Sequence, residues 1–104
     1  STDAVIHSRA LQVAVNITYI MKAAQQMTIT SKATTDTLDK LDISLRDPTN
    51  YGIDMMYYSS DSSVIATVTY SGDIDKERVK AILATDTIAD VDKVSYYKIF
   101  PVYW

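Results

Sequence analysis

Few side chains in this sequence could do chemistry, and the first to consider is its one histidine, His7. A zinc site needs several histidine or cysteine ligands, but the sequence has no second histidine and no cysteine. A serine nucleophile would have to use His7 as its base, and no G-x-S-x-G turn is present to expose such a serine. We therefore predict no catalytic residue and no enzymatic activity.

Closely spaced acidic residues raise the question of calcium, which prefers clusters of oxygen ligands. Asp73, Asp75 and Glu77 lie close together, but no glycine-pivoted twelve-residue loop surrounds them. They precede an amphipathic stretch, where acidic side chains cap helices, and we expect Asp73 to be the N-cap. No metal site and no cofactor are predicted. The later aspartates are expected to be solvated in a loop: Asp86, Asp90 and Asp92.

The amino-acid composition bears on the partners of the protein and on its place in the cell. The 104 residues carry a formal charge of -3, so the chain has no cationic surplus with which to hold nucleic acid. Twelve of the thirteen acidic residues are Asp and twenty-two residues are Ser or Thr, a balance that favours an exported or surface protein. No apolar run reaches the roughly 20 residues that span a bilayer. The opening STDAVIH leaves room for a membrane anchor ahead of Ser1.

Apolar residues recur every three or four positions from Ile6 to Met27, which predicts a long helix ending near Ser31. The stripe is wide, because Leu11 and Val15 lie off its main seam and are still apolar. Two interpretations stay open: the helix packs only on an internal sheet, or it also contacts a neighbouring subunit. In the second case Leu11 and Val15 are interface residues.

The second half of the chain predicts strands around one further helix. Alternating residues favour strands at 53–58 and 64–70, joined as a hairpin. Gly72 should form a tight corner, with positive φ or close packing, before a helix that starts after Asp73 and whose apolar stripe is Ile74, Val79, Ile82 and Leu83. A last strand, 91–100, should run parallel to the strand before that helix. We thus expect one α+β domain over 1–104, in the order helix, strand, strand, helix, strand, with helices packed on a three-stranded sheet.

Aromatic residues crowd the C-terminus. On a strand, Tyr96, Phe100 and Trp104 would face one way, and Tyr97 and Tyr103 the other. Only one set can cover the core, so the aromatics either pack against the first helix or form a contact surface. If they form a contact surface, the interface residues are Tyr97, Tyr103 and Trp104.

The segment from Ser62 to Ile99 has a recurring order of features: a short apolar strand, a glycine, a charged amphipathic helix, then a small residue and two valines three apart. These occupy Val64 to Tyr70, Gly72, Lys76 to Leu83, Ala89, Val91 and Val94. The segment resembles the BON domain and the ring-building motifs of membrane-associated secretion, pilus and sporulation machines. The earlier stretch ALQVAVNITYIMKAAQQM is similar, in its mixture of apolar and polar residues, to the exposed half of a type IV pilin's first helix.

These resemblances imply a non-enzymatic assembly or interaction domain outside the cytoplasm, periplasmic or at the cell surface, in a membrane-linked machine such as a pilus or secretion system. Its partners would be other protein subunits, copies of itself included. The alternative is a small-ligand or lipid-binding module, which would need a pocket between helix and sheet. A KH-like nucleic-acid module is a third class, but the sequence has no G-x-x-G loop.

Overall fold

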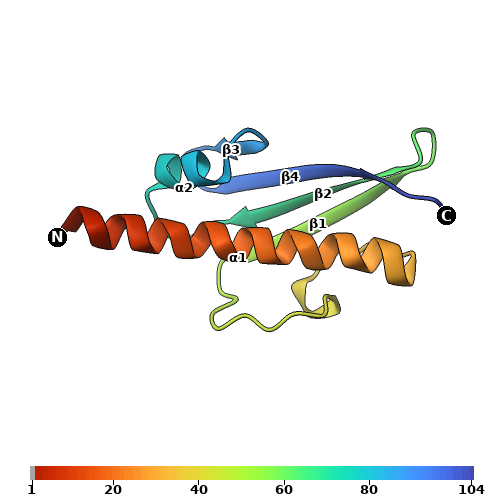
Figure 1. Cartoon of the computed structure of the whole chain (residues 1–104), viewed down its shortest axis with the longest axis horizontal. Coiled ribbons are helices and arrows are strands. Elements are labelled where there is room, and N and C mark those ends of the chain that lie inside the picture. The colour runs from red at the N-terminus through yellow and green to blue at the C-terminus, as the bar shows by residue number, and fades with distance from the viewer. Residues whose placement is uncertain (1) are drawn as a thin grey trace.

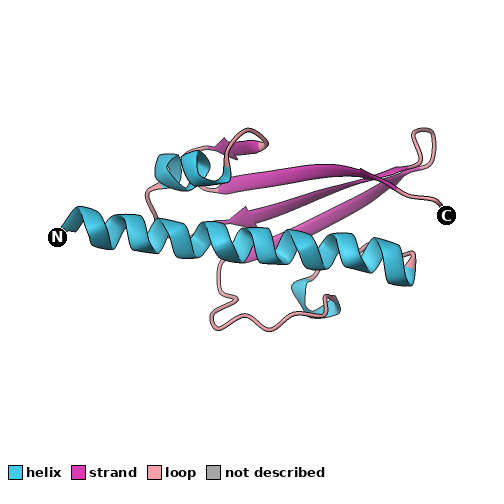
Figure 2. Ribbon diagram, in the orientation of Figure 1, coloured by secondary structure: helices cyan, strands magenta, loops and turns pink. Residues whose placement is uncertain are grey.

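A long helix crosses one face of an antiparallel sheet, with a short helix beside it (Figures 1 and 2). The structure is a computed structural model that describes residues 2–104. The helices are α1 (Thr2–Ser31), the short 3-10 helix η1 (Leu38–Lys40) and α2 (Lys76–Leu83). The strands are β1 (Tyr51–Tyr58), β2 (Ser63–Tyr70), β3 (Thr87–Ala89) and β4 (Val94–Pro101). The expected α+β class is confirmed.

Helix α1 ends at Ser31, as predicted, because Lys32 adopts a positive φ of 51° that breaks the helical path. Its sheet-facing side is made of small and medium side chains, which let the helix approach the strands closely. At the other end, the exposed Ile6 lies before the first buried residue, so α1 extends beyond the core (Figure 1). The buried side chains are Ala10, Val13, Ala14, Ile17, Ile20, Met21, Ala24 and Thr28.

The predicted hairpin of β1 and β2 is confirmed, with Met55 opposite Ala66 near its centre. The connection from α1 to β1 runs beside the sheet, on the side of α1 away from α2 (Figure 1). Leu41 in this connection is buried and belongs to the core, whereas its charged neighbours are exposed. The connection therefore contributes one buried side chain to the core, and the partly buried Leu38, Ile43 and Leu45 also pack against it.

The sheet has four strands in the order β1-β2-β4-β3, and every neighbouring pair is antiparallel. The expected three-stranded sheet with a parallel last strand is therefore wrong. The reason is β3, which follows α2 and reverses the chain before β4. Helix α2 thus connects β2 to β3, and β4 is inserted between these two strands. The last strand also starts later than expected, because Val91 lies in the turn before β4.

The corner between β2 and α2 is tightly packed at Gly72. Neither glycine has a positive φ. Gly72 is buried, and a Cβ on it would collide with the ring of Tyr70, which packs 4.7 Å from the ring of Tyr51. The absence of a side chain therefore leaves space for the Tyr70 ring.

The N-cap of α2 is Asp75, and the expectation of Asp73 is wrong. The Asp75 carboxylate accepts a hydrogen bond from the backbone N–H of Arg78 at 3.1 Å. The helix starts later because Gly72, Asp73 and Ile74 form a bend, in which Ile74 packs against the core.

Candidate functional site

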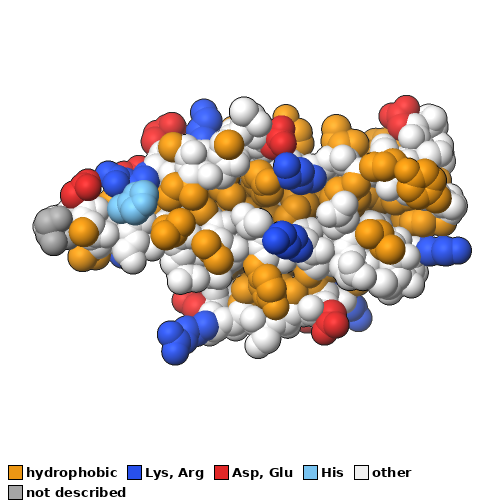
Figure 3. All heavy atoms as spheres, in the orientation of Figure 1, with side chains coloured by type: hydrophobic (Ala, Val, Ile, Leu, Met, Phe, Trp, Pro, Cys, Tyr) orange, Lys and Arg blue, Asp and Glu red, His pale blue; other side chains and the backbone are white. Residues whose placement is uncertain are grey.

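The side of α1 opposite the core carries exposed apolar residues, which we call the outward face: Leu11, Val15 and Tyr19. Their exposed fractions are 44%, 53% and 48%. Because they are spaced four residues apart, they lie along one line of the helix surface. Figure 3 shows hydrophobic side chains recurring along this exposed side of the molecule. The structure thus places Leu11 and Val15, two of the sequence-predicted interface residues, together at the surface.

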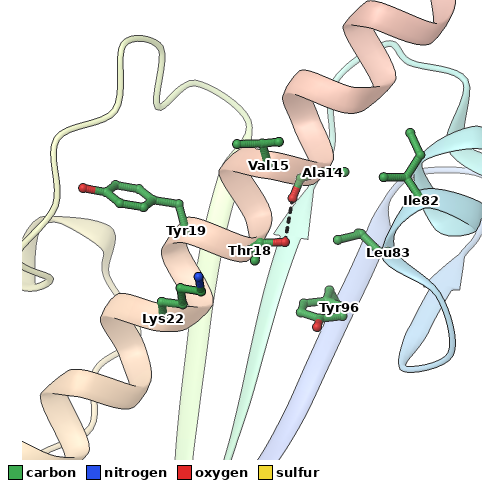
Figure 4. Close-up of a pocket in the computed structure, with 8 residues that line it drawn as sticks. All are labelled: Ala14, Val15, Thr18, Tyr19, Lys22, Ile82, Leu83 and Tyr96. Atoms are coloured by element: carbon green, nitrogen blue, oxygen red, sulfur yellow. Dashed lines mark hydrogen bonds between the residues drawn. The ribbon is translucent and has the colours of Figure 1, made fainter.

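A groove of 310 Å³ lies between α1 and α2, next to the outward face (Figure 4). Ile82 and Leu83 of α2 face Ala14 of α1 across it, and Tyr96 of β4 lies at its end. The Thr18 hydroxyl donates to the carbonyl oxygen of Ala14 at 2.9 Å, so its hydrogen bond is made within α1. The groove is therefore mostly apolar, and it contains no arrangement of a nucleophile with a base.

The C-terminal aromatics are divided between different surfaces. Tyr97 lies on the sheet face that points away from the helices, since its neighbour Tyr96 is buried beneath them. Trp104 stacks on Tyr57 of β1 with ring centroids 4.8 Å apart, and Tyr103 is 93% exposed. The predicted set of Tyr97, Tyr103 and Trp104 thus does not form one patch.

The face of the sheet away from the helices is also partly apolar, a feature that the sequence analysis missed. Met56, Ile65 and Ile99 are cross-strand neighbours in one row, which we call the open sheet face. Met56 and Ile99 are exposed, because both helices pack on the other face. The sequence did indicate it, because β1, β2 and β4 carry apolar residues at odd and at even positions, and these positions point to opposite faces of the sheet.

The one histidine belongs to a surface cluster that joins the two helices. Its Nδ1 lies 3.5 Å from an Arg78 guanidinium nitrogen, and the same guanidinium bonds the Asp3 carboxylate at 2.8 Å. Arg78 also contacts Asp75, the N-cap of its own helix, at 3.5 Å. The cluster links the first turns of α1 to α2, and each charged group in it has a partner.

Two of the later aspartates, which were expected to be solvated in a loop, have structural partners. Asp90 accepts hydrogen bonds from the backbone N–H groups of Lys93, at 2.7 Å, and Asp92, at 2.9 Å, and these bonds lower the pKa of its carboxyl group. Asp86 pairs with Lys98 at 3.2 Å. Within residues 2–104, no group of three or more histidine, cysteine, aspartate or glutamate residues is placed to hold a metal ion.

Comparison with known proteins gives no relative. No family model matches the sequence, and neither the curated proteins nor the solved structures contain a significant match. Among the described helices, none is both long enough and apolar enough to cross a bilayer. The similarities to BON domains and pilins therefore remain predictions, and the functional argument depends on the surfaces of this chain.

Proposed function

We propose that this chain is a non-enzymatic assembly domain, and that the outward face of α1 binds another protein subunit. The observation that carries the proposal is the exposed line of Leu11, Val15 and Tyr19. Apolar side chains grouped on one side of a helix favour burial against a partner, since each buried methylene contributes about 0.8 kcal/mol.

The spacing along this side of α1 supports a helical partner. Residues three or four apart continue the line in both directions from the outward face, and only one of them, Lys22, is charged. Such spacing is what one helix needs to pack against another along its length. The line comprises Ala4, Ser8, Leu11, Val15, Tyr19, Lys22, Gln26 and Ile29.

Support for the kind of machine to which we assign the domain comes from the sequence alone. The resemblance of Ser62 to Ile99 to BON and ring-building domains, and of α1 to a pilin helix, favours a pilus or secretion apparatus. The Asp-rich, Ser- and Thr-rich composition favours a place outside the cytoplasm. A partner in such an assembly would be another subunit or a second copy of this chain.

The double variant Leu11→Glu with Val15→Lys tests the proposal. Both positions are exposed, so circular dichroism should report an unchanged fold. In the source cells the full-length variant should lose its co-purifying subunits or its assembled particles, because the charges would be buried at the contact. Matched changes at the exposed Gln12 and Thr30, to Glu and Lys, should leave assembly intact. Normal assembly by the first variant would show that the outward face has no partner, and loss of its fold would show that Leu11 and Val15 are needed for folding.

The second candidate is a small-ligand or lipid-binding module, and one hollow favours it. This C-terminal hollow, between the end of α1 and the chain after β4, has a volume of 330 Å³ and a mostly apolar lining. Co-sedimentation with vesicles of anionic phosphatidylglycerol tests this candidate. Its lining residues are Gln25, Thr28, Ile29, Lys32, Phe100, Pro101, Val102, Tyr103 and Trp104.

A further inference from the structure

Half of strand β4 lies at an open edge of the sheet. Strand β3 is only three residues long and pairs with Val94–Tyr96. One more hydrogen bond follows, from the N–H of Tyr97 to the carbonyl oxygen of Asp86 at 3.1 Å. Within residues 2–104, no strand pairs with the rest of β4 on this side. Because backbone groups alternate along a strand, the N–H and C=O of Ile99 point outward from this edge, as does the C=O of Pro101.

A groove runs beside this edge, between β4 and the second half of α1. It begins with a hollow of 430 Å³ between these elements and continues into the C-terminal hollow. The two hollows share Gln25, Phe100 and Pro101, so they adjoin, and together we call them the β4 groove. In Figure 1 the second half of β4 continues beyond α2 and β3 toward the C-terminus, with α1 alongside. The lining of the first hollow is Thr18, Met21, Lys22, Gln25, Tyr96, Lys98, Ile99, Phe100 and Pro101.

The charge of the β4 groove is opposite to that of the protein. Lys22, Lys98 and Lys32 line it, and no aspartate or glutamate does, although the chain has a formal charge of -3. Lys98 is paired with Asp86 at 3.2 Å. Lys22 and Lys32 make no ion pair with any residue in the described part of the chain. The groove therefore favours an anionic occupant.

From these three features we infer that the β4 groove binds an extended acidic peptide, which adds to the sheet as a strand beside Ile99. Such a peptide satisfies the backbone groups of the edge, and its alternate side chains enter the groove. Its residue opposite Phe100 faces α1, and its residue opposite Ile99 extends the open sheet face. Its acidic side chains face Lys22 and Lys32. Pro101 removes one donor from the edge, which restricts unspecific strand pairing.

A peptide fits these features better than a helix or a lipid. A helix makes its backbone hydrogen bonds internally, so it would leave the N–H and C=O of Ile99 without partners. An acyl chain offers neither a donor nor an acceptor to this edge. The β4 groove shares Lys22 and Ile29 with the line along α1, but Leu11 and Val15 do not line it, so variants at these two positions separate the peptide site from the proposed subunit contact.

The experiment is a selection of random heptapeptides displayed on phage, followed by measurements on the selected peptides. Enriched sequences should alternate apolar and acidic residues. In the complex, the amide of Ile99 should become protected from hydrogen exchange, whereas its neighbours Lys98 and Phe100, which face away from this edge, should change little. Absence of enrichment, or selected peptides that leave the Ile99 amide unprotected, would overturn the inference. Binding of phosphatidylglycerol vesicles, with no peptide binding at this edge, would assign the groove to lipid instead.

The contribution of the lysine charges to peptide binding can be tested separately from that of the backbone hydrogen bonds at Ile99. Lys22→Glu with Lys32→Glu should weaken the binding of a selected peptide about tenfold, and more at low salt. The matched variant, Lys40→Glu with Lys80→Glu, changes the net charge equally outside the β4 groove and should bind normally. Equal affinity of the two double variants would overturn the predicted charge preference.

Ile99→Pro should abolish peptide binding by removing the outward N–H, whereas Ile99→Val retains it and should bind normally. Normal peptide binding by a folded Ile99→Pro variant would refute strand addition. If Ile99→Pro fails to fold, protection of the Ile99 amide in the unmodified chain still decides the question. The variant Leu11→Glu with Val15→Lys should bind the peptide normally, so failure of the proposed function would leave this result unchanged.

Discussion

At the scale of single residues, Ala84 adopts a backbone conformation that favours glycine. It follows the last residue of α2 with a φ of 73° and a ψ of -138°. At positive φ the Cβ of an alanine collides with its own backbone, whereas glycine has no Cβ. We predict that Ala84→Gly raises the free energy of unfolding by about 1 kcal/mol. Urea denaturation measures the change, and a decrease in stability would show that Ala84 is not strained.

Thr87 offers a second stabilising change, because its hydroxyl is buried without a hydrogen-bond partner in the described part of the chain. A buried hydroxyl without a partner costs about 1–3 kcal/mol. Valine has nearly the same shape and lacks the hydroxyl, so we predict that Thr87→Val stabilises the protein by about 1 kcal/mol. The melting temperature measures the effect. Thr87→Ser, which keeps the hydroxyl and loses the methyl group, should be destabilising instead.

At the scale of elements, the first turn of α1 contributes little to the core, which begins at Ala10. The Asp3 carboxylate bonds Arg78, but exposed ion pairs contribute only about 0–1 kcal/mol. We predict that removing residues 1–5 lowers the free energy of unfolding by less than about 1 kcal/mol. Removing residues 1–13 takes away the buried Ala10 and Val13 together with the helical turns that carry them, and should lower the free energy of unfolding clearly more than the shorter deletion does. A large loss for the shorter deletion would show that the first turn is structural.

The long elements could be predicted from the sequence, and the short ones could not. Helix α1 repeats its apolar pattern over many turns, and β1 and β2 are eight-residue runs rich in apolar and aromatic residues and bounded by turn residues, so their type was evident. Strand β3 has three residues, too few to establish a period. Missing β3 gave the wrong strand count and the wrong direction for β4, because a single added strand reverses the chain.

The surfaces were less predictable than the elements, since they depend on which strand lies at an edge. The pattern of α1 indicated Leu11 and Val15 as apolar positions off the main seam, and the structure places both at the surface. The role of Ile99 was not visible in the sequence. It follows from the short length of β3, which leaves the N–H and C=O of Ile99 pointing outward.

At the scale of the whole molecule, the protein measures 50 × 25 × 18 Å, and its proposed binding features lie at different places along this length. The outward face includes Leu11 and Val15, in the first half of α1. The edge at Ile99 lies on β4, near the C-terminus (Figure 1). A domain with these two surfaces can hold a subunit at Leu11 and Val15 and a peptide at the edge of β4.

The last prediction is that these two surfaces are independent. Leu11→Glu with Val15→Lys should abolish assembly and leave the affinity for a selected heptapeptide unchanged, whereas Ile99→Pro should do the reverse. Changes at distant sites without shared contacts are additive within about 0.5 kcal/mol, so the combined variant should lose each activity to the same extent as its parents. Calorimetric titration of the peptide and co-purification of subunits measure the two activities. If Leu11→Glu with Val15→Lys changed the peptide affinity more than about threefold, the two surfaces would be coupled through α1.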